Sequence, residues 1–515
     1  MPRGRTENVE ASVSKPLPSL HSAVPPDAMP GPRARLLVSG DLHLGRYPSR
    51  VPPGDPALTL EAVVRSLVDQ AIERRVDAVV LTGDVADQSN KYFEAFGVLE
   101  RALHRLVDAG VPVVAVAGNH DHDVLGSVAE AVGEGVRVLG RGETWESASI
   151  EKGGREVVRL WGWSFAGPYV HASPLETLPA DLGDVPAVGV LHADLDAPSS
   201  RYAPVALADL WATGASAWLL GHIHAPRTER RDGQLVLNPG SPQPLDPGEP
   251  GEHGAWIVEI TEDGRAAAEI VPLATVRYDA LAVDLDGAAD ATEVRQRAAG
   301  VLRDYAEGVR ADSPAVRRAV VRLTLKGRTP AYRAVERVAS ELVDGGETAS
   351  GALVVAVDRV DDLARPALDL DRLAEGSGPV ATLAALARRL ERGEPAEGDL
   401  ALIRRGVDAL QQARRARVFE PLGRSDRLGH DLAAEAVLRL RRQTYRLLDE
   451  VLSQRPADAA PSASAEPSAE PPPSTPAAGS PTDAESPSTP AVSDPALDTP
   501  EAEETVPSDA AGASG

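Results

Sequence analysis

The chain has 515 residues, of which 43% are hydrophobic, so it is long enough to form two or three domains with a sizeable core. It contains no cysteine, which excludes disulfides, thiolate catalysis and cysteine-ligated zinc, and which fits a reducing cytoplasm. The formal net charge is −24, which argues against a general nucleic-acid coat protein. Any contact with nucleic acid therefore needs a local basic face, metal ions or a partner.

Both ends of the sequence lack an apolar pattern. Residues 1–33 contain clustered prolines, and residues 456–515 are rich in Pro, Ser, Ala, Thr and Glu, with 11 acidic residues and no Lys or Arg between Ala457 and Gly515. We expect a disordered N-terminal extension and a disordered acidic tail. The sequence predicts no membrane span and no secretion signal. Met29 leaves open whether translation starts there or at Met1.

From residue 34 to residue 275, short apolar strands alternate with helical stretches. Leu60–Arg74 and Tyr92–Asp108 have apolar residues at three- and four-residue spacing, as amphipathic helices do. This alternation predicts an α/β fold for the segment. The expected strands are Leu36–Ser39, Ala78–Thr82, Val113–Ala117, Val157–Trp161, Ala187–Leu191, Ala217–Leu220, Leu235–Leu237 and Ala255–Ile260.

Two further regions follow this segment. Residues 276–375 predict an α+β domain, with strands at Leu281–Leu285, Ala319–Lys326 and Ala352–Val357 and a helix at Ala291–Ala306. Residues 376–455 predict a helical segment that ends in a helix at His430–Ser453. That last helix has an apolar stripe, which must fold back on the chain or meet a partner. The stripe is Ala433, Val437, Leu440, Leu447 and Val451.

Five polar clusters lie at or just after the ends of predicted strands. Because loops at the strand ends of α/β sheets converge, we expect these clusters to form one site. A single histidine after a strand is usually structural, and Asp-x-His alone is weak, but five clusters in this order are a strong signal. They are Gly40-Asp41-Leu42-His43, Gly83-Asp84, Gly118-Asn119-His120-Asp121, His192 and Gly221-His222-Ile223-His224.

The side chains in these clusters have the chemistry of metal ligands. Carboxylate, imidazole and amide groups without sulfur suit Mn, Fe, Zn or Ni, and the share of oxygen favours Mn. The possible ligands are too many for one ion, whereas a bridging Asp84 would let two ions about 3.5–4 Å apart hold four each. Such a pair clamps a phosphate and activates a water. The possible ligands are Asp41, His43, Asp84, Asn119, His192, His222 and His224.

Other polar residues near the clusters receive different roles. His120 is the candidate acid for the leaving oxygen, because it is next to a ligand and is not needed as one, and Asp121 could orient it. Several carboxylates could support the ligands, although solvated loop carboxylates are more common; these are Asp87, Asp123, Asp194 and Asp196. No role is assigned to His21, His104, His171, His253 and His430.

The order of the five clusters resembles the calcineurin-like metallophosphoesterase superfamily over roughly Arg35–Ile260. The resemblance implies a four-layer fold, in which two packed mixed sheets are flanked by helices, and it implies that His120 is the catalytic histidine. It also implies two ligand sets that share Asp84. One ion would be bound by Asp41, His43, Asp84 and His224, and the other by Asp84, Asn119, His192 and His222.

Within the superfamily the chain is most similar to SbcD-like subunits of the YhaO type, through Trp218–His224, Asn238–Gln243 and Lys326–Pro330. This implies a Mn-dependent DNA exonuclease or endonuclease that acts in DNA repair with an SbcC-like coiled-coil ATPase, with a homodimer also possible. It further implies that residues 276–375 cap the site and that residues 376–455 dock on the ATPase.

Two other functions are compatible with part of this pattern. A calcineurin-like phosphatase or phosphodiesterase acting on a small molecule or a protein would use the same metal site. The long region after Thr275 favours the nuclease over it. A scaffold without catalytic activity is the third alternative, and the complete set of possible ligands argues against it.

Overall fold

The computed structural model describes residues 33–87, 93–415 and 432–454. The two expected disordered ends, apart from Arg33, lie outside the described residues, as do Met29 and the expected start of the last helix at His430. Within the described part of the chain, no helix is both long enough and apolar enough to cross a membrane.

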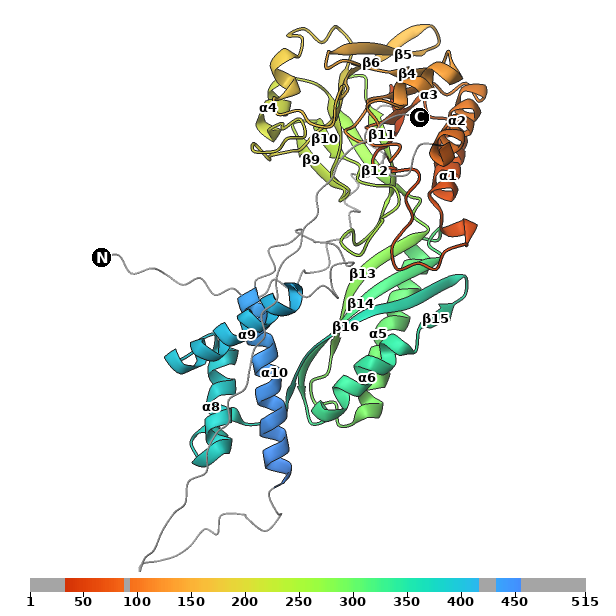
Figure 1. The fold of residues 1–515 in the computed structure, drawn as a ribbon. Coiled ribbons are helices and arrows are strands. Elements are labelled where there is room, and N and C mark those ends of the chain that lie inside the picture. Colours follow the sequence, from red (N-terminus) through yellow and green to blue (C-terminus); the bar gives the residue numbers. More distant parts are fainter. Residues whose placement is uncertain (1–32, 88–92, 416–431, 455–515) are drawn as a thin grey trace, which may run out of the picture. The chain divides into compact units, whose positions relative to one another are not determined.

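Two six-stranded mixed sheets form the first part of the chain (Figure 1). The first sheet has the order β12-β11-β1-β2-β3-β4 and the second β5-β6-β7-β8-β10-β9. The first consists of β1 (Ala34–Ser39), β2 (Ala78–Leu81), β3 (Val113–Ala115), β4 (Val136–Val138), β11 (Gly254–Ile260) and β12 (Ala266–Pro272). The second consists of β5 (Glu146–Lys152), β6 (Arg155–Trp163), β7 (Ala187–His192), β8 (Ala217–Gly221), β9 (Arg227–Arg231) and β10 (Gln234–Asn238).

The strands are apolar on both faces because both faces are covered. On β1, Leu36 and Val38 lie in the core between the two sheets, whereas Leu37 lies in a separate core against helices. Those helices are α1 (Leu60–Glu73), α2 (Phe93–Asp108) and α3 (Leu125–Val132).

The outer face of the second sheet is also covered. Trp218 and Leu191 pack there with Leu210 of the short helix α4 (Leu207–Ala212). The order of helices, sheet, sheet and helix confirms the expected α/β fold of mixed sheets flanked by helices.

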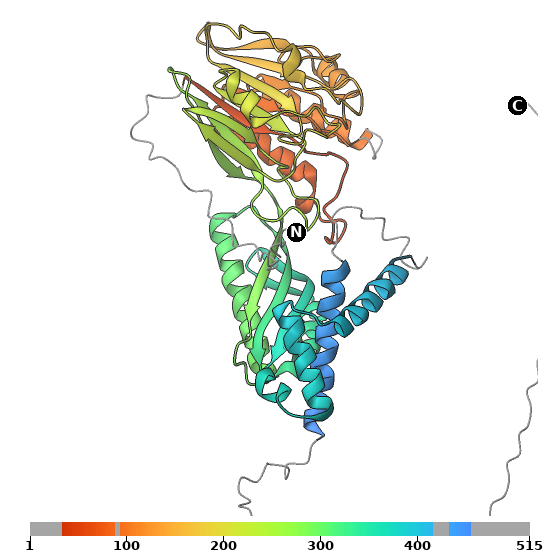
Figure 2. The ribbon, with the colours of Figure 1, turned by 90° about the vertical axis from the view of Figure 1, so that its left-hand side faces the viewer.

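Residues 276–366 form a third, four-stranded sheet in the order β13-β14-β16-β15. Its strands are β13 (Val276–Asp284), β14 (Arg318–Thr329), β15 (Glu347–Ser350) and β16 (Leu353–Pro366), with the helices α5 (Ala291–Asp312) and α6 (Tyr332–Asp344). Figure 2 shows α5 alongside these strands, and Val309 of α5 shares a core with Leu323 of β14.

Strands and helices alternate along this region, and β13, β14 and β16 are parallel, which differs from the segregated arrangement that α+β describes. The expected strands are present and longer than predicted, while β15 and α6 were not predicted. The sequence of β14 alternates apolar and polar residues from Val321 to Lys326, and the structure follows this pattern: Val321, Leu323 and Leu325 are buried, whereas Lys326 is exposed.

The helices α7 (Leu370–Ala374), α8 (Gly378–Arg392), α9 (Glu397–Arg415) and α10 (Leu432–Ser453) complete the described chain. The stripe predicted for α10 is wrong at two positions, because Ala433 is exposed and Leu447 is 51% exposed. The buried face instead carries Ala436, Tyr445 and Leu448. These residues pack in clusters shared with α8, α9 and the third sheet, so the helix folds back on its own chain.

This packing predicts different outcomes for two adjacent leucines of α10. Leu448→Ala should lower the free energy of unfolding by about 2–5 kcal/mol, because Leu448 is fully buried in a core cluster. Leu447→Ala, its matched control, should change it by less than about 0.5 kcal/mol, because that side chain is half exposed. Chemical denaturation of both variants tests this, and equal losses would mean that the face of α10 is assigned wrongly.

Candidate metal centre

All five polar clusters converge at the carboxyl ends of strands from the first two sheets. The positions follow from the topology, since parallel strands end at the same edge of a sheet. Asp41 follows β1, Asp84 follows β2, Asn119 and His120 follow β3, His192 ends β7, and His222 and His224 follow β8. The structure thus brings the seven predicted ligands together at this edge.

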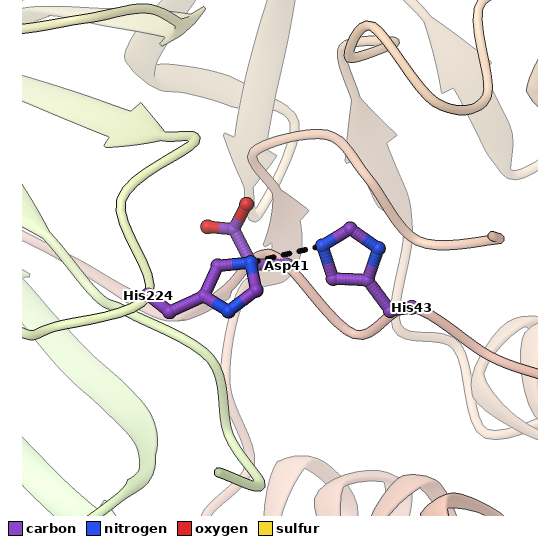
Figure 3. Close-up of side chains that lie close together, drawn as sticks. All are labelled: Asp41, His43 and His224. Atoms are coloured by element: carbon purple, nitrogen blue, oxygen red, sulfur yellow. Dashed lines mark hydrogen bonds between the residues drawn. The ribbon is translucent and has the colours of Figure 1, made fainter. Parts of the chain in front are cut away.

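One cluster, here called the first metal group, contains Asp41, His43 and His224 (Figure 3). Each offers a ligand atom, and these atoms lie within 4.8 Å of one another. The Nε2 atoms of His43 and His224 are 3.0 Å apart. The Asp41 carboxylate accepts a hydrogen bond from the backbone N–H of His222 at 3.0 Å, which joins this group to the loop after β8.

The hydrogen bonds behind the two histidines fix which ring nitrogen is free. The Nδ1 atom of His43 lies 3.2 Å from Asp87, and that of His224 lies 2.7 Å from Glu249. A carboxylate only accepts, so each Nδ1 carries the proton. In the neutral rings that bind metals, two Nε2 lone pairs therefore face each other at 3.0 Å. This contact is repulsive unless a proton or a metal cation lies between them, and the convergence of two imidazoles with the Asp41 carboxylate fits a metal ion.

The second metal group contains Asp84, His192 and His222, whose ligand atoms also lie within 4.8 Å of one another. The Nδ1 atom of His192 lies 3.0 Å from the carbonyl oxygen of Thr82, which only accepts, so this nitrogen donates. The Nε2 atom of His192 lies 3.1 Å from Asn119 Oδ1 and 3.2 Å from Asp84 Oδ2. Burial by itself would lower the pKa of His192, but the Asp84 carboxylate outweighs burial and raises that pKa to about 9. Two oxygen atoms and one imidazole nitrogen therefore converge on a point that favours positive charge, which fits a metal ion.

Asp84 lies between the two groups. Its Oδ2 atom is 3.2 Å from His192 Nε2 and 3.9 Å from His43 Nε2, while Oδ1 accepts the backbone N–H of His120 at 2.9 Å. Burial by itself would raise the pKa of Asp84, but the neighbouring histidines, led by His192, outweigh burial and lower that pKa below its ordinary value. An ionised carboxylate in this position is suited to bridge two cations.

The backbone at the site is strained. Asp41, His43, Asp84 and His222 have φ angles of 50°, 46°, 50° and 93°, in the left-handed region that residues other than glycine seldom occupy. Gly118 is required for a different reason, because a Cβ atom there would lie 2.2 Å from Asp84 Oδ1. Strain of this kind collects at functional sites, where the surrounding fold enforces it.

His120 lies at the open edge of the site. Its side chain is 40% exposed, its ring stands edge-on to that of His43 at 5.1 Å, and its Nδ1 atom is 3.9 Å from Asp87. Partial burial lowers the pKa of His120 against the opposing effect of Asp84. This accessible imidazole can reach a substrate and carry a proton.

Asp121 is fully buried, and its two oxygens accept backbone N–H groups of Gly118 at 2.8 Å and Val85 at 2.7 Å. Burial raises the pKa of Asp121 to about 6. These bonds fasten the loop after β3 to the loop after β2. The expected role of Asp121 in orienting His120 stays a prediction. The Asp87 carboxylate lies 3.9 Å from His120 Nδ1 and could orient the ring as well.

Sequence reasoning missed Glu249, which supports His224, and gave no role to the stretch that begins at Asn238. Asn238 Nδ2 donates to the carbonyl oxygens of Ile223 at 2.7 Å and Ala225 at 3.1 Å, and so holds the backbone on either side of His224. Glu249 stands in a loop rich in proline and glycine, without a spacing that marks it. Its place after the recognisable Asn238–Gln243 stretch is the one available signal.

A cavity of about 650 Å³ opens beside His222. Arg201, Tyr202, Asp194 and His171 are among its lining residues, so His171, to which the sequence assigned no role, borders the site. Asp194 Oδ2 lies 3.7 Å from His222 Nε2, in agreement with a supporting role for this carboxylate. The cavity offers room for a substrate next to the second metal group.

Comparison with known proteins places this geometry in a family. Residues 35–263 match the model of the calcineurin-like phosphoesterase superfamily domain. The chain is also 30% identical to the DNA double-strand break repair protein Mre11 of Haloferax volcanii over 350 residues, which is 64% of this chain and 68% of that protein. The chain belongs to the calcineurin-like phosphoesterase superfamily.

Further relatives of this phosphoesterase include metallophosphoesterase YhaO of Bacillus subtilis, 28% identical over 53% of this chain and 65% of that protein. The chain thus matches slightly less than two thirds of the length of YhaO. A solved structure of a dimetal phosphatase from Danio rerio aligns over 47% of this chain and 96% of that chain, with 14% identity and a TM-score of 0.33.

Proposed function

We propose that this phosphoesterase is a metal-dependent DNA nuclease, an exonuclease or endonuclease that acts in DNA repair with an SbcC-like ATPase. The observation that carries the proposal is the extent of the similarity to a repair protein. The alignment with Haloferax Mre11 spans 64% of this chain, more than the segment 35–263 that the superfamily model matches. A phosphatase that shared the catalytic domain alone would not account for this further similarity.

The proposed chemistry is hydrolysis of a phosphodiester at the two metal groups. Two divalent ions, with Mn²⁺ favoured by the mixed nitrogen and oxygen ligands, would supply Lewis-acid activation of the phosphate and of a water. His192, held by Thr82, and His224, held by Glu249, keep their Nε2 atoms turned into the site. His120, accessible at the edge, is positioned to donate a proton to the leaving oxygen.

The cavity beside His222 supports a phosphodiester substrate. The guanidinium of Arg201 lies 4.3 Å from the centre of the Tyr169 ring and lines this cavity. A cation next to an exposed aromatic ring suits a nucleotide, whose phosphate is anionic and whose base can stack. Such a contact also gives this acidic chain a local positive group where a nucleic acid would enter.

We further propose that residues 276–375 cap the site and that residues 376–455 dock on the ATPase. The third sheet contacts the catalytic part, since Tyr278 and Val320 share a small core with Leu58. On α9, Leu400 and Leu402 are each 41% exposed, which leaves apolar side chains for a partner even though α10 folds back. A homodimer and a cytoplasmic location remain predictions from the sequence.

The choice of substrate tests this proposal. With Mn²⁺ present, the purified chain should release nucleotides from linear duplex DNA and should cleave bis(p-nitrophenyl) phosphate faster than p-nitrophenyl phosphate, because the site is assigned to diesters. EDTA should abolish both reactions. If the chain hydrolyses phosphomonoesters readily and leaves DNA intact, the nuclease assignment fails and the phosphatase alternative replaces it.

A further inference from the structure

The loop Leu245–Gly251, between β10 and β11, contacts the first metal group through one side chain. Glu249 is largely buried, with 14% of its side chain exposed, and its Oε1 atom lies 2.7 Å from His224 Nδ1. The other oxygen, Oε2, accepts the backbone N–H of Leu245 at 2.7 Å. Glu249 therefore uses both oxygens, one on a candidate ligand and one on its own loop.

The same loop is fastened to the third sheet. The Tyr278 hydroxyl, on β13, donates to the carbonyl oxygen of Ser49 at 2.5 Å and lies 3.5 Å from that of Leu245. Ser49 in turn donates its backbone N–H to Leu245 at 2.8 Å, and the N–H of Gly251 donates to the Tyr278 carbonyl at 3.0 Å. Both ends of the loop are thus bonded to β13 or to the segment that Tyr278 holds.

We propose that Glu249 is a positioning residue that fixes His224 for metal binding, and that the loop Leu245–Gly251 couples this ligand to strand β13. The inference rests on the proposed metal site. A displacement of β13 would move Leu245 and Gly251, and with them the carboxylate that orients the His224 ring. The position of the third sheet would thereby set the affinity of the first metal group, while the second group is fixed by other contacts.

Glu249 does more than close its own loop. A glutamate that only closed the loop would need the bond to Leu245, whereas the other oxygen of Glu249 contacts His224 Nδ1 at the same distance of 2.7 Å. That contact selects the tautomer with a free Nε2, which the first metal group requires. The second metal group has its own support, because Thr82 holds His192.

The test is a titration of metal-free protein with Mn²⁺, followed by calorimetry and by electron paramagnetic resonance. Glu249→Gln should lower the affinity for one of the two Mn²⁺ ions by about 10–100-fold and leave the affinity for the other unchanged. The matched control is Glu252→Gln, which removes a half-buried glutamate that accepts from Ser313 Oγ at 3.0 Å instead of contacting a ligand. Loss of affinity for one ion only is a result that a general loss of folding would not give.

Tyr278→Phe tests the coupling to β13. It should lower the affinity for the same ion by a smaller factor. In the double variant with Glu249→Gln, the loss of affinity should be less than the product of the two separate losses, since both residues act through one loop. Tyr305→Phe is the control, because that hydroxyl donates to Asp279 within the third sheet. If Glu249→Gln binds both Mn²⁺ ions with parental affinity, Glu249 does not position His224. If Tyr278→Phe does so, the loop does not couple this ligand to β13. A parental chain that bound no Mn²⁺ would instead overturn the proposed function.

Discussion

Replacement of His120 by alanine is expected to reduce turnover by about 10²–10⁴-fold while both metal ions stay bound. The His120 side chain is 40% exposed at the edge of the site. The hydrogen bond from His120 to Asp84 is donated by the backbone N–H, which alanine retains. The variant should therefore lose proton donation to the leaving oxygen and keep the metal ligands in place. Rates on duplex DNA and on a small diester, at saturating Mn²⁺, measure the loss.

The neighbouring His122 provides a control for this change. It lies in the same loop, it is half-buried, and it is not one of the seven candidate ligands, so His122→Ala should keep near-parental rates. Metal content of both variants should equal that of the parental chain. If His120→Ala turned over DNA at the parental rate, His120 would have no part in the reaction.

Replacement of Asp84 by alanine is expected to weaken the binding of both metal ions, and so to abolish turnover. Asp84 is the carboxylate that lies near ligands of both groups, at 3.2 Å from His192 and 3.9 Å from His43. Its loss leaves each group one negative charge short. Equilibrium dialysis against Mn²⁺ measures the number of ions bound per chain.

Asp121→Asn is the matched control for Asp84. Asp121 is an equally buried carboxylate on an adjacent loop, but its oxygens accept backbone N–H groups from Gly118 and Val85. The asparagine variant can accept only one of these two bonds, but it removes no ligand, so it should still bind two ions per chain. An Asp84→Ala protein that still bound two ions with parental affinity would show that no carboxylate at this position bridges them.

The metal site was predictable because its residues are local to strand ends. Asp41, Asp84 and His192 follow apolar runs that are recognisable from the sequence, and the topology of two parallel sets of strands then brings them together. The support for the ligands was less predictable. Glu249 reaches His224 across 25 residues of loop and strand, and no periodic pattern marks such a contact.

The outer regions show a second limit of sequence reasoning. The strand predicted at Ala352–Val357 stops before the charged run that begins at Asp358, yet β16 continues to Pro366 because it pairs with β14. Arg322 on β14 forms an ion pair with Asp358 and so accommodates this charge in the sheet. Such pairing depends on a distant segment, and local composition does not contain it.

The same reason explains the difference at α10. An apolar stripe gives the period of a helix, but the buried face is decided by what packs on it. Here α8 and α9 cover Ala436, and the third sheet and its helices cover Tyr445 and Leu448, so Leu447 is left exposed.

The central claim, that these seven side chains form a two-metal centre, is tested most directly by anomalous diffraction at the manganese edge from crystals soaked in Mn²⁺. Two peaks about 3.5–4 Å apart are expected. One should lie between Asp41, His43 and His224, and the other between His192, His222 and Asn119, with Asp84 between the two peaks. A single peak, or peaks outside these two groups, would show that the seven side chains do not form a two-metal centre.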